Sequence, residues 1–220
     1  MTSDMESFSG DLSKMWTLQD RPPLHHLTWD WWWWLVMLDD PDGRPSGRQL
    51  MVLWSTKDNE LVEVNGMPWT PAGRPSYDDE HGLALDGMVC AWWFDGQQMH
   101  EPVIQQICRM IAMPDTHSMW PDDATNAGRG GGAVVPLIEN DLSMGLKSDL
   151  SAFWIHLLTD ESASHPKVPK KLDLTLTPWN AAMSTARQAT ATYAANMGYD
   201  ILRLHGTKVH GKLDDEEVSG

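Results

Sequence analysis

Basic residues and long apolar runs are both scarce in this sequence. Sixteen Lys and Arg stand against 31 Asp and Glu, which gives a formal net charge of −15. We expect no nucleic-acid partner, because a phosphate backbone is bound by clustered basic side chains. Acidic membrane surfaces are disfavoured for the same reason. The longest apolar run, residues 31–38, is far shorter than the ~20 residues of a membrane helix, so we expect no transmembrane segment.

Cysteine is also scarce, and no secretory signal is recognisable. Cys90 and Cys108 are the two cysteines of the chain. They can pair only if their strands are neighbours, and two buried thiols in a reducing compartment are the expected state. The N-terminal segment MTSDMESFSGDLSK is polar and acidic and lacks the apolar core of a signal peptide. We therefore expect a cytoplasmic protein in which residues 1–23 form a polar tail and residues 24–220 form one domain.

Tryptophan is abundant, with 13 residues against three Tyr and three Phe. Five of them fall in the segment Trp29-Asp30-Trp31-Trp32-Trp33-Trp34. A helix would spread these rings around its circumference, whereas a strand sends alternate residues to opposite faces. We predict a strand with one face that includes Trp31 and Trp33 and another that includes Trp32 and Trp34. Both faces are apolar, so we expect this strand to be covered on both sides.

Strand and turn signals recur along the rest of the chain. The dense turn at residues 39–47 predicts a hairpin between the tryptophan-rich strand and residues 49–55. Further strands are expected at residues 83–94, 102–113, 133–138, 153–158 and 171–177, and on either side of Gly211, with residues 114–132 as a loop. The alternation at residues 171–177 predicts a half-exposed strand. Only residues 180–197 are rich in alanine, and both a helix and a long crossing segment are compatible with their composition. The pattern predicts an all-β, antiparallel barrel or strongly bent sandwich of about 8–10 strands.

Three segments resemble the lipocalin-like AttH and carotenoid hydratase (CrtC) family. The run from Trp29 to Trp34 resembles the family's Glu-Trp-Trp-Tyr signature, and Leu172-Asp173-Leu174-Thr175-Leu176-Thr177-Pro178 resembles its Asp-Leu-Thr-Leu-Thr-Pro strand. Leu204-His205-Gly206-Thr207-Lys208-Val209-His210-Gly211 resembles its late hairpin. The resemblance implies a lipocalin-like barrel that handles a hydrophobic isoprenoid-like molecule, as a binder or as a hydratase or lyase, without a metal or an organic cofactor. Family members commonly carry two such domains, so the resemblance also implies that residues 24–220 are the first of two and that the second is absent or truncated.

Asp30 and His25 are the candidate catalytic residues. Asp30 corresponds to the leading Glu of the family's signature, but it is shifted within a longer tryptophan run. Hydration of an alkene begins with proton transfer from an acid, and burial among indoles would raise the pKa of a carboxyl group toward that task. The structural alternative is that Asp30 accepts indole N–H hydrogen bonds and that His25 and His26 are surface residues.

The histidines and glycines outside this segment predict no further chemistry. His81, His100 and Glu101 lie near strand ends, but their spacing matches no metal motif, so we expect no metal site. Residues 128–132, GRGGG, lack the Lys-Ser/Thr of a phosphate-binding loop and are expected to be a flexible loop.

The remaining tryptophans allow three interpretations. In the first, an apolar ligand cavity is walled by Trp32, Trp34, Trp54, Trp92 and Trp93. In the second, exposed rings form a platform for sugars, as in a carbohydrate-binding β-sandwich module. In the third, the rings only pack the core. The resemblance favours the cavity over the sugar platform.

Overall fold

The computed structural model of the chain describes residues 4–9, 29–57, 62–64, 66–69, 76–78, 82–113, 129–134, 142–158, 166–179, 182–190, 197–204 and 206–220. All regular secondary structure within these ranges is β-strand, and the strand ladders are antiparallel, as predicted. The strands are β1 (Asp4–Ser9), β2 (Trp29–Asp39), β3 (Pro45–Lys57), β4 (Val62–Val64), β5 (Met67–Trp69), β6 (Ser76–Asp78), β7 (Gly82–Phe94), β8 (Ile104–Met113), β9 (Arg129–Val134), β10 (Ser143–Lys147), β11 (Phe153–Leu158), β12 (Lys171–Pro178), β13 (Ala182–Thr190), β14 (Met197–Leu204), β15 (Thr207–Leu213) and β16 (Glu216–Ser219). In this part of the chain no helix is long and apolar enough to cross a membrane.

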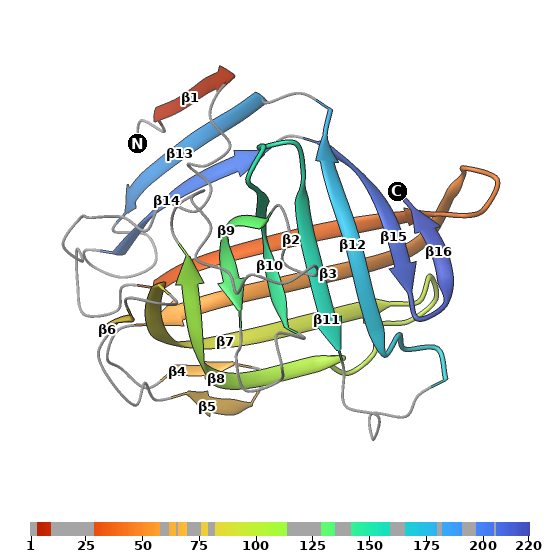
Figure 1. Cartoon of the computed structure of the whole chain (residues 1–220), viewed down its shortest axis with the longest axis horizontal. Helices are drawn as coiled ribbons and strands as arrows, with labels where there is room; N and C mark the ends of the chain where they lie inside the picture. Colours follow the sequence, from red (N-terminus) through yellow and green to blue (C-terminus); the bar gives the residue numbers. More distant parts are fainter. Residues whose placement is uncertain are drawn as a thin grey trace.

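One large sheet organises the fold. Its strand order is β16-β15-β12-β11-β10-β9-β8-β7-β3-β2, with β6 added beside β7, which makes eleven strands. Two small sheets accompany it, β1-β13-β14 and β4-β5. The large sheet bends over itself, so that β10, β11 and β12 cross in front of β2, β3 and β7 (Figure 1). The number of strands exceeds the 8–10 that the sequence predicts.

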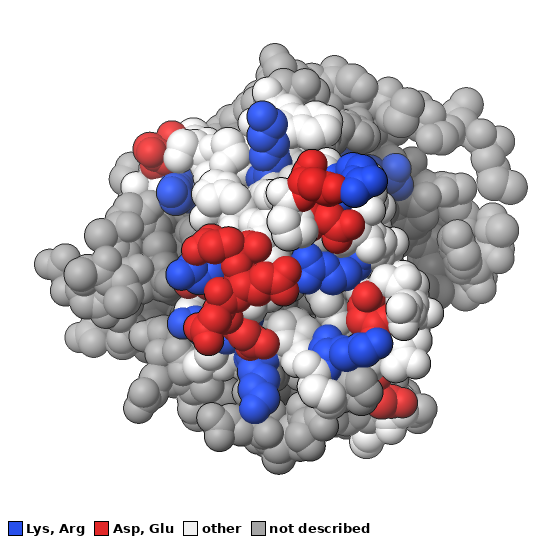
Figure 2. Space-filling model, turned by 90° about the vertical axis from the view of Figure 1, so that its right-hand side faces the viewer, with Lys and Arg blue, Asp and Glu red and all other residues white. Residues whose placement is uncertain are grey.

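The two ends of the large sheet approach each other. A Cβ built on Gly220, just after β16, would lie 2.0 Å from the carbonyl oxygen of Met37 in β2. Arg48 in β3 also donates from Nη1 to both carboxylate oxygens of Glu216 in β16, at 3.0 and 3.2 Å. Acidic and basic side chains lie side by side on the face of the molecule that carries this end of the fold (Figure 2). Among the described residues, no ladder joins β16 to β2, so contacts rather than a continuous sheet bring these ends together.

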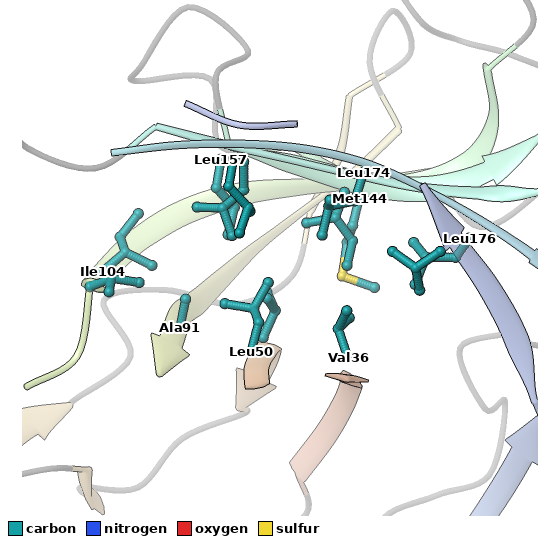
Figure 3. Packing of buried hydrophobic residues seen from close by; sticks show 14 of the residues in the cluster. Val36, Leu50, Ala91, Ile104, Met144, Leu157, Leu174 and Leu176 are labelled. Atoms are coloured by element: carbon teal, nitrogen blue, oxygen red, sulfur yellow. The ribbon is translucent and has the colours of Figure 1, made fainter. Parts of the chain in front are cut away.

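The main core lies between the two halves of the bent sheet. Val36, Leu50 and Ala91 point from one half toward Met144, Leu157 and Leu174 of the other (Figure 3). The strand β12 shows why these residues lie here, because its leucines alternate with polar side chains and only the leucines are buried. The half-exposed strand predicted at residues 171–177 is therefore confirmed.

Four local predictions need correction or completion. The alanine-rich segment, residues 180–197, contains β13 and ends at the first residue of β14, and its described residues form strand and not helix. Gly130, Gly131 and Gly132 lie in β9, which pairs with β10, so the prediction of a flexible loop is wrong for these glycines. Gly211 lies within β15 and not between two strands. The segment predicted as a polar tail includes β1, which pairs with β13.

Candidate functional site

The tryptophan-rich segment forms the strand that the sequence predicts. In β2, Val36 and Leu38 are buried and Trp32 and Trp34 are half-buried, all on the face directed at the core. The alternate positions carry the exposed side chains of Trp31, Trp33, Leu35 and Met37. The expectation of cover on both sides is therefore wrong for these four residues. The physical reason is tertiary, because the bent sheet supplies a second layer on one face of β2 only.

Four of the five predicted ligand-binding tryptophans lie on the inner face. Trp32 and Trp54 are direct neighbours in the β2–β3 ladder. Trp54 and Trp93 are buried within the core, and Trp32 and Trp34 pack against it while remaining partly accessible. Trp34 reaches across the interior to Phe153 of β11, with 5.0 Å between the ring centroids and a tilt of 58°. All four rings therefore belong to the main core or pack against it, and we call them the inner tryptophan group: Trp32, Trp34, Trp54 and Trp93.

Trp92 lies on the opposite face of the sheet. It packs against Met88 and Cys90, which form a separate small buried cluster with Leu53. Trp92 and Trp93 are consecutive residues of one strand, so they must face opposite sides. The structure thus brings together four of the five predicted tryptophans and separates the fifth from them.

One polar atom of the inner tryptophan group lacks a partner. The indole nitrogen of Trp54, Nε1, is buried and has no hydrogen-bond acceptor among the described residues. Trp93 differs, because its Nε1 donates to the carbonyl oxygen of Lys167 at 2.9 Å. Buried polar groups are nearly always hydrogen-bonded, and an unpaired one costs about 1–3 kcal/mol. Within the described part of the chain, the Trp54 N–H is therefore a fully buried donor without an acceptor.

The predicted catalytic pair lies largely outside the described residues. The backbone of Asp30 belongs to β2 and pairs with Thr56 of β3. The side chain of Asp30 and the whole of His25 lie outside the described part of the chain. The general-acid hypothesis therefore stays a prediction.

A buried hydrogen bond between His100 and Asp95, which the sequence did not predict, holds the connection between β7 and β8. His100 Nε2 donates to Asp95 Oδ2 at 2.9 Å, and both side chains are nearly inaccessible. The backbone N–H of Gln98, followed by the ring of His100, holds the pKa of the Asp95 carboxyl well below its ordinary value, and Gln97 and Lys167 add to this effect. The turn at Asp95-Gly96 was recognisable in the sequence, but the contact between Asp95 and His100 depends on how the β7–β8 hairpin closes.

The contact with Asp95 occupies one ring nitrogen of His100, Nε2. Its ring is engaged by a carboxylate, and Glu101 is exposed to solvent. Within the described ranges, no group of three or more His, Cys, Asp or Glu side chains is placed to hold a metal ion.

Ser143, His156 and Asp173 face one another across three adjacent strands, β10, β11 and β12. These residue types are those of a nucleophilic hydrolase site. Here, however, Ser143 is fully buried and its hydroxyl has no hydrogen-bond partner among the described residues. His156 Nδ1 lies 3.6 Å from Asp173 Oδ2, which is longer than a hydrogen bond. Among the described residues, Ser143 therefore has no hydrogen bond to His156, and its buried hydroxyl is not accessible to a substrate. A nucleophilic serine needs both.

The cysteine prediction is confirmed for Cys90. It is a buried free thiol, and burial raises the pKa of Cys90 to about 12. In the β7–β8 ladder its neighbour is Gln105, whereas Cys108 pairs with Gly87. A thiol with such a pKa is protonated at neutral pH and is a poor nucleophile, so Cys90 serves packing.

Comparisons with known proteins give no further assignment. No protein-family model, no curated protein and no solved structure matches this chain. The site is therefore interpreted from its own residues.

Proposed function

We propose that this protein binds an apolar small molecule against the inner tryptophan group. The observation that carries the proposal is the buried Trp54 N–H, which has no acceptor among the described residues and belongs to a group of aromatic rings. Ligand sites combine a mostly apolar lining with a few polar groups that fix the orientation of the ligand. A single unpaired donor among indole rings has this character. It favours an apolar ligand that carries one oxygen acceptor, such as a carbonyl or hydroxyl group.

The accessibility of the rings supports the same proposal. Trp32 and Trp34 are half-buried although their strand neighbours Val36 and Leu38 are fully buried. The inner face of β2 therefore becomes more accessible toward its N-terminal half. A ligand that entered from this end would meet Trp32 and Trp34 first and would then reach Trp54.

A barrel-like closure of the sheet is part of the proposal. The contacts of Gly220 with Met37 and of Arg48 with Glu216 bring the first and last strands of the sheet together. A lipocalin-like barrel holds its ligand inside such a closed sheet. The resemblance to the AttH and carotenoid hydratase family favours an isoprenoid-like ligand over other apolar molecules.

The Trp54→Phe variant tests the proposal. Phenylalanine keeps an aromatic ring but lacks the N–H group. The assay uses two fluorescent apolar probes that differ only in a carbonyl group. We expect Trp54→Phe to weaken the binding of the carbonyl probe about tenfold, because one neutral hydrogen bond is lost. The affinity of the hydrocarbon probe should change much less. Equal losses for both probes would contradict a donor role for Trp54.

Trp32→Ala and Trp92→Ala provide the matched comparison. The sequence predicts that both rings wall the site, but Trp92 faces the other side of the sheet. We therefore expect Trp32→Ala to weaken probe binding and Trp92→Ala to leave it unchanged. If both variants lose stability and neither loses affinity, the inner tryptophan group only packs the core.

Catalysis is a second step of the proposal and depends on Asp30. Asp30→Asn retains the shape of the side chain and an acceptor oxygen but removes the transferable proton. If the protein hydrates an alkene, product formation should fall by the ~10²–10⁴-fold typical of general-acid loss, while polyene binding persists. Wild-type protein that binds polyenes and forms no hydrated product would restrict the function to binding.

Carbohydrate binding is the alternative function, and the exposed pair Trp31 and Trp33 is the observation that favours it. Their ring centroids lie 6.2 Å apart, but the ring planes are tilted by 40° and do not form one flat platform. Retention on insoluble polysaccharide, compared with retention of added polyenes, separates the two functions. Retention that is lost in Trp33→Ala and unchanged in Trp32→Ala would favour the sugar platform.

A further inference from the structure

The outer face of β2, β3 and β7 is apolar and partly exposed. The ladders place four residues of each strand on this face, which we call the outer apolar face: Trp31, Trp33, Leu35 and Met37; Gln49, Met51, Leu53 and Ser55; Met88, Cys90, Trp92 and Phe94. None of the twelve is charged, and three of them, Ser55, Met88 and Cys90, are fully buried, so the exposed part of the face lies along β2. In β2 the exposed fractions are 37% for Trp31, 44% for Trp33, 48% for Leu35 and 60% for Met37. Contiguous exposed apolar surface of this kind marks a site of interaction.

We propose that the outer apolar face docks the protein on an uncharged lipid surface. The first argument is the kind of side chain. Tryptophan is suited to the boundary between lipid and water, because its large ring is apolar and its N–H is polar. Leu35 and Met37 extend the same strand with flexible aliphatic side chains, and they bring no donor or acceptor for a sugar or a polar peptide.

The second argument is charge. The chain carries a net charge of −15, and the turn beside Met37 adds the exposed Asp40 and Asp42. An anionic membrane would repel the protein, whereas a zwitterionic surface would not. Charged side chains are plentiful elsewhere, as on the face shown in Figure 2. Their absence from twelve neighbouring ladder positions is therefore a local property of this surface.

The third argument is area. The exposed residues of the face form a single row along β2, about 20 Å long. A standard interface between proteins buries about 800 Å² on each partner. The face is thus too small for a stable dimer of this chain. A lipid surface needs no matching area on a folded partner.

The inference rests on the proposed function in one respect. A protein that binds an apolar molecule gains access to it by docking on a lipid surface in which such a molecule dissolves. Docking by the outer face and binding by the inner face use opposite sides of β2. The two properties can therefore be tested separately with variants at neighbouring positions.

The experiment is cosedimentation with phosphatidylcholine vesicles in the absence of any ligand. We expect the protein to sediment with these vesicles. Mixing in anionic phosphatidylglycerol should lower the bound fraction through charge repulsion, and added salt should restore part of the binding because it screens this repulsion. Trp33→Thr combined with Leu35→Thr should lower the partition coefficient roughly tenfold or more, since about half of each side chain is still exposed. Threonine retains strand propensity, so the fold should persist.

Trp179→Thr is the matched control. Trp179 is 67% exposed, more than any residue of the outer apolar face, but it lies at the end of β12 beside Gly206. Its replacement should leave vesicle binding unchanged. Each single threonine variant is measured as well, with circular dichroism as the check of folding.

Three results would overturn the inference: no cosedimentation of the wild type with phosphatidylcholine, equal binding by the folded double variant, or a face occupied by another copy of the chain. The last would appear in light scattering as a concentration-dependent dimer that the double variant abolishes. Loss of vesicle binding with intact probe affinity in the double variant supports docking. Loss of probe affinity in Trp32→Ala with intact vesicle binding concerns the proposed function alone.

Discussion

Replacing Gly211 with alanine should strongly destabilise the large sheet. Gly211 lies in β15 opposite Leu174 of β12, with a φ of +154°. A Cβ at this position would lie 2.0 Å from the carbonyl oxygen of Asp173 and 2.9 Å from the Cα of Leu174. Both are backbone atoms, so no side chain can rotate away. The two strands must separate by about 1 Å or more to restore an ordinary contact.

The expected loss follows from what this separation disrupts. Two or three ladder hydrogen bonds around Gly211 would weaken, each worth about 0.5–1.5 kcal/mol in net stability. The buried side chains of Leu174 and Leu213 would also lose part of their packing. We expect Gly211→Ala to lower the free energy of unfolding by about 2–4 kcal/mol. Urea titration followed by circular dichroism measures this value. An m-value equal to that of the wild type would show that the same two-state transition is compared in both proteins.

Gly43→Ala is the control for backbone conformation alone. Gly43 has a φ of +78° in the exposed β2–β3 turn, and a Cβ there would meet no atom within 4 Å. Its replacement should cost about 1 kcal/mol, from the left-handed conformation only. If Gly211→Ala costs no more than Gly43→Ala, the close approach of β12 and β15 is not a constraint and the reasoning fails.

Two further predictions concern titratable groups. The pKa of Asp95 is lowered by Gln98 and His100, so its carboxylate contributes stability above its ordinary value of 3.8, and that contribution declines as the pH falls below about 4. Asp95→Asn should therefore be less stable than the wild type at pH 6 in thermal melts, and the gap should narrow toward pH 3; a constant gap would contradict the role of this contact. Because the pKa of Cys90 is raised to about 12, the folded protein should leave this thiol unmodified by iodoacetamide at pH 8, as peptide mass analysis would show. Rapid labelling of Cys90 in the folded state would be inconsistent with its burial.

The sequence by itself determined the class of the fold and the positions of its strongest strands. Alternation in residues 171–177 predicts β12 because one face of that strand meets the core and the other meets solvent. The tryptophan-rich strand was predictable because a helix would spread its rings around the whole circumference, whereas a strand sends them to two faces. Glycine and alanine were less informative, because both are compatible with several conformations when local propensity alone is considered. Only strand pairing placed Gly132 in β9 and residues 182–190 in β13.

The tertiary structure alone decided which side of β2 faces the core. Both faces of the segment are apolar, so no pattern in the sequence distinguishes Trp32 and Trp34 from Trp31 and Trp33. The bend of the large sheet places a second layer over one face, and this layer leaves Trp33 44% exposed on the other. In the same way, closure of the β7–β8 hairpin unites Asp95 with His100. These features depend on contacts between residues that are distant in sequence or on the side of a sheet that is covered, and single-chain periodicity carries neither kind of information.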